Sequence, residues 1–163
     1  MQLRAPITSY PRMLVKNFRP FDPIRVAKET EKIVCTNESR KYTAFYAAGV
    51  YGGIATGYAV GCCFRCFFCW SDWSRDFPEL YGEFCSAEEA YRNIVKAAER
   101  WNVRRARISA CEPTLCRGHL IRLLELIEKN ERIELFILET NGILFGASKN
   151  YVKEISNFNK VHV

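Results

Sequence analysis

The sequence lacks a secretory signal, and it lacks an apolar run suited to a bilayer. Its first twenty residues contain four basic side chains and no apolar block, unlike a cleavable signal peptide. The charge-free stretch 44–64 is 21 residues long, but it holds five glycines, one isoleucine and no leucine. It therefore predicts buried strands and turns. We expect a cytoplasmic protein with no membrane partner.

A strong net charge is also missing. The formal charge of +6 on 163 residues is a mild excess, and its densest run, 104–107, is typical of a solvated helix end. Charge alone therefore gives only weak support for a nucleic-acid partner. Because 48% of the residues are hydrophobic, the chain is expected to fold around a substantial core.

Cysteine, by contrast, is abundant, with eight residues. In a reducing cytosol this number indicates metal or redox chemistry before disulfides. Cys62, Cys66 and Cys69 follow the spacing C-x3-C-x2-C, and three thiolates so close need a loop that wraps around a soft metal or a cluster. Three protein ligands leave one iron of a [4Fe–4S] cluster open, as a catalytic metal requires.

The competing interpretation of these cysteines is a zinc site or chance clustering. Zinc would need a fourth protein ligand, for which Cys63, Cys85 and His119 are available, but no second C-x2-C pair is present. The remaining cysteines form no second cluster motif, and most of them are expected to be buried small hydrophobic residues: Cys35, Cys85, Cys111 and Cys116.

Strand and helix patterns alternate after the cysteines. Ser86 and Glu89 form a capping box, and an apolar stripe follows at helical spacing as far as Trp101. The other predicted helices are 24–34, 119–129 and 150–158, and the predicted strands are 54–60, 106–110, 133–138 and 160–163, with 41–60 as a hairpin and 133–138 buried on both faces. This order predicts parallel strands joined by right-handed crossovers.

The cysteine motif, with Phe68 just before its last cysteine, resembles the signature of the radical S-adenosylmethionine (SAM) superfamily. The resemblance implies an α/β fold, a partial (β/α) barrel whose first strand is 54–60. Residues 1–50 would be an N-terminal arm and 51–163 the first part of the core, truncated after about four strands. A chain that stops on a strand predicts a longer reading frame, or a partner that completes the sheet.

The resemblance also implies the cofactors and the reaction. Cys62, Cys66 and Cys69 would ligate three irons of a [4Fe–4S] cluster, and SAM would bind the fourth. One electron, from a donor such as ferredoxin or flavodoxin, would cleave SAM to methionine and a 5′-deoxyadenosyl radical that abstracts hydrogen from an unknown substrate. The enzyme would be of oxidoreductase or transferase type. The alternative is a non-catalytic iron–sulfur or zinc protein for electron transfer or partner binding, favoured by the missing half of the barrel.

Two further motifs follow predicted strands. Ala110-Cys111-Glu112-Pro113 resembles the Gly-Gly-Glu-Pro stretch of the family, which makes Glu112 a candidate contact for the SAM amino group, although both glycines are replaced. Glu139-Thr140-Asn141-Gly142 resembles turns of other members, and Thr140 and Asn141 are candidate SAM or substrate contacts at the barrel mouth. The alternative for the second motif is simply a favourable Asn-Gly turn.

Aromatic residues crowd the cysteine segment. Phe67, Phe68, Trp70 and Trp73 are expected to shield a cluster from water, and Phe68 is counted with the candidate cofactor-binding residues. Base stacking by these rings is the other use considered. Together with the mild basicity, Trp70 is the only support for an RNA substrate.

Overall fold

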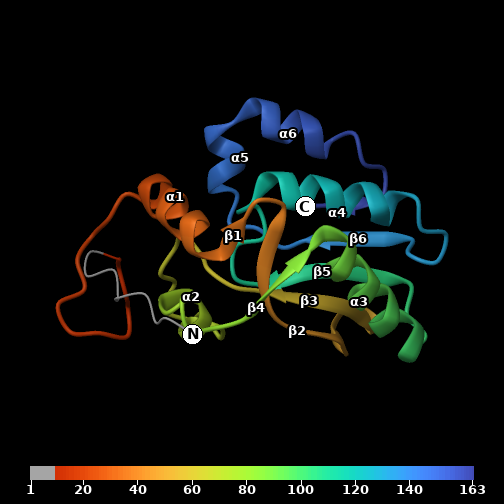
Figure 1. Cartoon of the computed structure of the whole chain (residues 1–163), viewed down its shortest axis with the longest axis horizontal. Coiled ribbons are helices and arrows are strands. Elements are labelled where there is room, and N and C mark those ends of the chain that lie inside the picture. The colour runs from red at the N-terminus through yellow and green to blue at the C-terminus, as the bar shows by residue number, and fades with distance from the viewer. Residues whose placement is uncertain (1–9) are drawn as a thin grey trace.

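A computed structural model describes residues 10–163 (Figure 1). The predicted arm before residue 10 lies outside the described residues. The elements are, in chain order, α1 (Pro23–Val34), β1 (Cys35–Thr36), β2 (Ser39–Ala48), η1 (Val50–Gly52), β3 (Ile54–Ala59), α2 (Asp72–Asp76), β4 (Glu83–Ser86), α3 (Ala87–Arg100), β5 (Arg105–Ala110), α4 (Arg117–Glu128), β6 (Leu135–Leu138), α5 (Ile143–Ala147), α6 (Lys149–Ile155) and β7 (Val161–His162).

The described strands form one seven-stranded sheet in the order β1-β2-β3-β5-β6-β7, with β4 added beside β2. The pairs β3–β5, β5–β6 and β6–β7 are parallel, and segments containing helices connect them. This confirms the predicted alternation of strands and helices. The α/β class with a partial barrel is confirmed as well. Within residues 10–163 the sheet stays open and does not close into a barrel.

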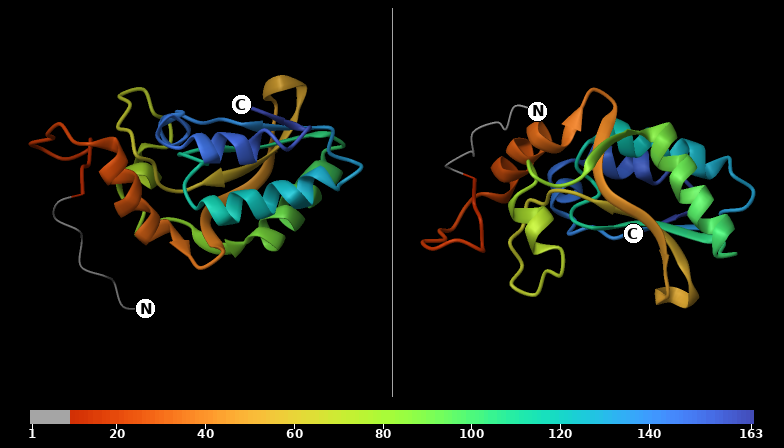
Figure 2. Two further views of the ribbon diagram at one scale, coloured as in Figure 1. Left: turned by 90° about the horizontal axis from the view of Figure 1, so that it is seen from above. Right: turned by 60° about the horizontal axis from the view of Figure 1, so that its bottom comes forward.

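The antiparallel side of the sheet was missed by sequence reasoning, apart from the hairpin. β2 pairs with β3 through a hairpin whose tip is η1, and Figure 2 shows this tip projecting from the body of the protein. The first residues of β2 also pair with β4, and β1 pairs with the same end of β2. Residues before 51 therefore share a sheet with the core strands. The proposed domain boundary at 50/51 stays a prediction.

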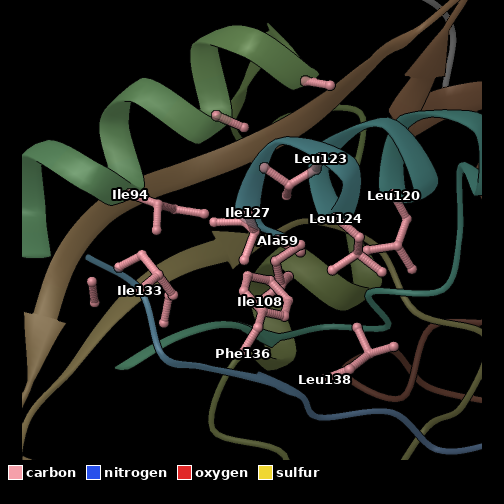
Figure 3. Close-up of a cluster of buried hydrophobic side chains, with 14 of the residues drawn as sticks. Ala59, Ile94, Ile108, Leu120, Leu123, Leu124, Ile127, Ile133, Phe136 and Leu138 are labelled. Atoms are coloured by element: carbon pink, nitrogen blue, oxygen red, sulfur yellow. The ribbon is translucent and has the colours of Figure 1, made fainter. Parts of the chain in front are cut away.

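The main core lies between the sheet and helices α3, α4 and α6. Ile94 of α3 and Leu123 of α4 meet Ile108 of β5 and Phe136 of β6, all with no exposed surface (Figure 3). Each such side chain contributes about 1.5–3 kcal/mol by leaving water.

Local signals explain where the helices begin. The capping box of α3 is confirmed, because Ser86 Oγ accepts from the Glu89 N–H at 3.1 Å and Glu89 Oε2 accepts from the Ser86 N–H at 2.8 Å. The Asp22 side chain caps α1, which starts with Pro23. No helix within the described residues is long and apolar enough to cross a membrane.

The prediction that strand 133–138 is buried on both faces is wrong. In β6, Phe136 and Leu138 are buried against the helices, whereas Leu135 and Ile137 are only half-buried. The reason is that α3, α4 and α6 pack on one face of the sheet. The other face carries polar side chains, including Thr56 and Arg107, whose Nε donates to Thr56 Oγ1 at 3.0 Å.

Candidate functional site

Three loops meet at the carboxyl ends of β3, β5 and β6. Parallel strands place these ends along one edge of the sheet. The Glu112 N–H donates to Gly61 O at 3.0 Å, which joins the loop after β5 to the loop after β3. The Asn141 N–H donates to Glu112 Oε2 at 2.9 Å, which joins the loop after β6. The structure therefore brings together the three motifs that were predicted separately.

The first of these loops carries the predicted cluster ligands. Cys62, Cys66 and Cys69 are partly exposed, and a tight turn links the last two, with the Cys69 N–H donating to Cys66 O at 3.2 Å. Three thiols on one wrapping loop suit the donor chemistry of an iron–sulfur cluster. Across residues 10–163, no three His, Cys, Asp or Glu side chains are gathered to share one metal ion, so the ligand set stays a prediction.

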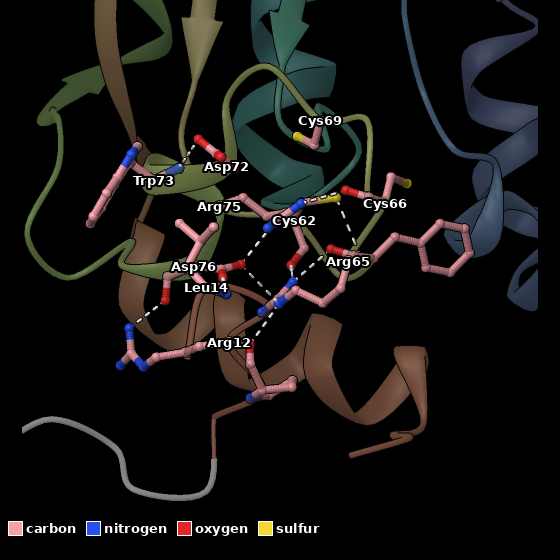
Figure 4. Close-up of polar contacts among 12 residues, drawn as sticks. Arg12, Leu14, Cys62, Arg65, Cys66, Cys69, Asp72, Trp73, Arg75 and Asp76 are labelled. Atoms are coloured by element: carbon pink, nitrogen blue, oxygen red, sulfur yellow. Dashed lines mark hydrogen bonds and ion pairs between the residues drawn. The ribbon is translucent and has the colours of Figure 1, made fainter. Parts of the chain in front are cut away.

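A buried ionic triad holds the cysteine loop by its backbone (Figure 4). Asp76 has no exposed surface, and its carboxylate lies 2.7 Å from Arg75 Nε and 3.3 Å from Arg65 Nε. Arg65 Nη1 donates to Cys62 O and Arg75 Nη1 donates to Cys66 O, both at 2.7 Å. These residues were missed from the sequence, where charged residues beside a cysteine motif carry no distinctive signal.

The N-terminal segment seals this triad from outside. Arg65 Nε donates to Pro11 O at 2.6 Å, and Arg12 donates to Asp76 O and pairs with Glu79 at 2.6 Å. The Leu14 N–H donates to Asp76 Oδ2 at 2.9 Å. Residues 11–14 of the N-terminal segment thus contact the base of the cysteine loop.

Glu112, the candidate SAM contact, is 1% exposed. Its Oε1 accepts from the Thr114 N–H at 2.9 Å, from the Thr114 hydroxyl, and from Thr140 Oγ1 at 2.6 Å. Its Oε2 accepts from the Asn141 N–H. The carboxylate therefore joins two loops by hydrogen bonds from within the protein. Its contact with SAM stays a prediction.

Ala110 and Cys111 occupy the two positions where the family motif has glycine, and the structure shows how their side chains are accommodated. Ala110 has φ +85°, a left-handed conformation that glycine adopts more easily. The neighbouring Cys111 thiol is buried and lies 3.7 Å from Ser71 Oγ and 3.6 Å from Ser74 Oγ. Burial, reinforced by the nearby Cys62, raises the pKa of Cys111 to about 12.

Asn141 links the third motif to the cysteines. Its Nδ2 lies 3.3 Å from Cys63 Sγ and 3.7 Å from Cys62 Sγ. A side-chain hydrogen bond between Cys62 and Cys63, together with burial, raises the pKa of Cys62 well above its usual range, while the same Cys62–Cys63 bond lowers the pKa of Cys63. Burial raises the pKa of Cys66. Ligation of a metal requires thiolates, so cluster assembly would release protons.

Phe67 and Phe68, which were predicted to shield a cluster from water, are 87% and 74% exposed, and their shielding role stays a prediction. Phe67 and Phe68 pack edge to face on each other, with their ring centroids 5.1 Å apart. Trp70 is largely exposed too, although its ring meets Tyr58 of β3 edge to face at 5.9 Å. The role of Phe68 in cofactor binding stays a prediction.

Two cysteines were interpreted wrongly. Cys35 and Cys116 form a disulfide, with their Cα atoms 5.8 Å apart, where reduced buried thiols were expected. The end of α1 and the start of α4 bring them together across 81 residues, which sequence spacing cannot reveal. The proposed zinc ligand His119 is also occupied, since Nε2 lies 2.9 Å from the Tyr42 hydroxyl and Nδ1 lies 2.9 Å from Glu38 O.

The chain is similar in sequence to known proteins. Two relatives are a GTP 3',8-cyclase from Desulforamulus reducens, 32% identical over 102 residues, and a probable GTP 3',8-cyclase from Methanococcus maripaludis, 37% identical over 83 residues. The matches cover 62% and 51% of this chain but only 30% and 26% of the relatives. The chain thus spans less than a third of their length. No solved structure matches it significantly.

The family model "Radical SAM superfamily" matches residues 58–163. The match begins within β3 and includes all three loops that meet at the sheet edge. Since it covers well over half of the sequence, the chain belongs to the radical SAM superfamily.

Proposed function

We propose that Cys62, Cys66 and Cys69 hold a [4Fe–4S] cluster and that SAM binds beside it, between the loops after β3, β5 and β6. A cluster held by these three thiolates would, when reduced, supply one electron for the cleavage of SAM and so give access to radical chemistry on a substrate. The observation that carries the proposal is the convergence of the three motifs through Glu112 and Asn141.

The protein residues have distinct tasks in this proposal. Arg65, Arg75 and Asp76 hold the cysteine backbone, so the three thiolates are presented on a preformed loop. The Asn141 Nδ2 lies 3.7 Å from the sulfur of Cys62, one of the proposed ligands, and N–H donors near a ligand sulfur tune the potential of iron–sulfur centres. Glu112 keeps the loops after β5 and β6 at a fixed spacing, with Thr140 as one of its partners.

The first experiment asks whether the cluster forms and cleaves SAM. The chain is reconstituted anaerobically with iron and sulfide, reduced with dithionite and mixed with SAM, and 5′-deoxyadenosine is measured. We expect a brown protein with about four irons that forms this product. Cys66→Ala should abolish the cluster, whereas the matched control Cys63→Ala should keep it. A colourless zinc protein, or equal behaviour of the two variants, would refute the ligand assignment.

The substrate class follows from the relatives only as a proposal. Both are named GTP 3',8-cyclases, so a purine nucleoside triphosphate is the first substrate to test. A ring-forming reaction then fits better than the expected oxidoreductase or transferase type. Hydrogen transfer from deuterated GTP into 5′-deoxyadenosine would support this substrate. The electron donor, ferredoxin or flavodoxin, and an RNA substrate stay predictions.

One observation favours the second candidate function, a non-catalytic iron–sulfur protein. The Ser71 hydroxyl lies 3.4 Å from Cys69 Sγ and 3.7 Å from Cys111 Sγ, which places a further thiol close to the cysteine loop. A fourth thiolate would close the cluster and exclude SAM. In that case Cys111→Ala would remove the cluster and the wild type would not cleave SAM. Under the main proposal, Cys111→Ala keeps the cluster.

A further inference from the structure

Arg40, in β2, has no exposed surface and lies outside the segment matched by the family model. Its Nη1 donates to Pro113 O at 2.6 Å and to Leu115 O at 2.8 Å. Its Nη2 donates to Glu112 O at 2.6 Å and lies 3.5 Å from Val60 O. One guanidinium therefore holds three carbonyls of the loop after β5 and reaches the residue just before the cysteine loop.

The charge of Arg40 is balanced by backbone carbonyl oxygens and by no carboxylate among the described residues. Within residues 10–163 its guanidinium forms no ion pair, and its Nε has no hydrogen-bond partner. A buried cation without a carboxylate is costly to desolvate. The carbonyl oxygens that accept hydrogen bonds from Arg40 offset that cost. Only a planar group with several N–H donors, such as guanidinium, can reach all four carbonyls at once.

We propose that Arg40 is a positioning residue that sets the spacing between the cysteine loop and the Glu112 loop, and thereby the geometry of the SAM site. This inference rests on the proposed function. Two additional contacts from the same region support it. Glu31 Oε1 accepts from the Cys116 N–H at 3.2 Å, and Cys35 is bonded to Cys116. The N-terminal region is thus built into the loop that would contact SAM.

The first arm of the test needs neither cluster nor SAM. Amide hydrogen exchange is followed in the purified chain for wild type, Arg40→Met and the matched control Lys41→Met. Lys41 is the adjacent β2 residue, and its Nζ also donates to two backbone carbonyls, Pro78 O at 3.0 Å and Glu79 O at 3.2 Å, in a different loop. We expect Arg40→Met to speed exchange at 111–116 about tenfold or more, and Lys41→Met to leave that segment unchanged.

The second arm measures SAM binding by equilibrium dialysis on the reconstituted proteins, with iron content and absorption spectrum as references. Arg40→Met should weaken SAM binding about tenfold at unchanged iron content, while Lys41→Met binds as wild type. If Arg40→Met does not fold, Arg40→Lys replaces it, because lysine keeps the charge and loses the fork. Arg40→Lys should then show smaller changes of the same kind.

Two results would overturn the proposal: an Arg40 variant with wild-type exchange at 111–116, or a Lys41→Met protein that loses SAM affinity equally. A wild type that binds no SAM would refute the proposed function instead, and the exchange arm would still decide whether Arg40 positions the loop.

Discussion

The loop after β3 and the loop after β5 lie at the same edge of the sheet, but they differ in how far their candidate side chains are exposed. In the first, the candidate ligands Cys62, Cys66 and Cys69 stay partly exposed, while buried charges hold only the backbone. In the second, the candidate SAM contact Glu112 is itself buried and accepts hydrogen bonds from its own loop and the next. Both loops resemble motifs of the family. The cysteines of the first loop are accessible to a ligand, whereas Glu112 of the second already accepts hydrogen bonds from the protein.

The strongest way to break this comparison is to remove the support of the cysteine loop. Asp76→Asn should destabilise the chain by about 3 kcal/mol or more, because two buried guanidinium groups lose their anion. Urea unfolding and iron content after reconstitution measure the effect. The control Glu125→Gln removes an exposed partner of Arg122 and should change neither. Equal behaviour of the two variants would show that the triad does not support the loop.

The second prediction concerns the engaged carboxylate. Glu112→Gln should cost about 2 kcal/mol, because an amide NH₂ would face donors that now point at an oxygen. Urea unfolding and SAM binding are measured on the same variant. Lost SAM binding at wild-type stability would mean that Glu112 contacts the ligand and does not hold the loops together, and the contrast between the loops would disappear.

The third prediction concerns Ala110, which stands where the family motif has glycine. Ala110→Gly should stabilise the protein by up to about 1 kcal/mol, because relief of the positive φ exceeds the entropy cost of glycine. The matched control is Ala106→Gly, earlier in the same strand and fully buried, which should destabilise by about 1 kcal/mol. Thermal unfolding of both variants measures the sign of each change in stability. A loss of stability at both positions would argue against strain at Ala110.

The smallest effect is expected at the exposed rings. Phe68→Ser should change the free energy of unfolding by less than about 0.5 kcal/mol, because the ring is 74% exposed. Phe136→Ala, at a ring with no exposed surface, should cost about 3–5 kcal/mol. A large loss of stability for Phe68→Ser would show that the aromatic rings cover the loop after all.

Much of the site was predictable because its signals are local. The spacing of the three cysteines identified the loop, and the alternation of apolar runs placed Glu112 and Asn141 after parallel strands, whose ends must adjoin. The capping box of α3 was read correctly for the same reason. β1 and β4 were missed because strands of two and four residues pair only in the context of β2.

The residues that hold the site were not predictable. Arg40 meets Glu112 O across 72 positions, and Asp76 meets the Leu14 N–H across 62. Hydrogen bonds to backbone carbonyls leave no pattern in the sequence, because every residue carries a carbonyl. The pairing of Cys35 with Cys116 likewise depends on where two helix ends meet.

The sequence by itself determined the family, the alternation of the parallel strands with the longer helices, and the loop that carries three cysteines, since spacing and periodicity are properties of neighbouring residues. Only the tertiary structure decided that Glu112 is engaged, that Phe68 points into solvent and that Arg40 joins two loops. Burial and hydrogen-bond partners depend on segments distant in the chain, and these become neighbours only when the sheet assembles.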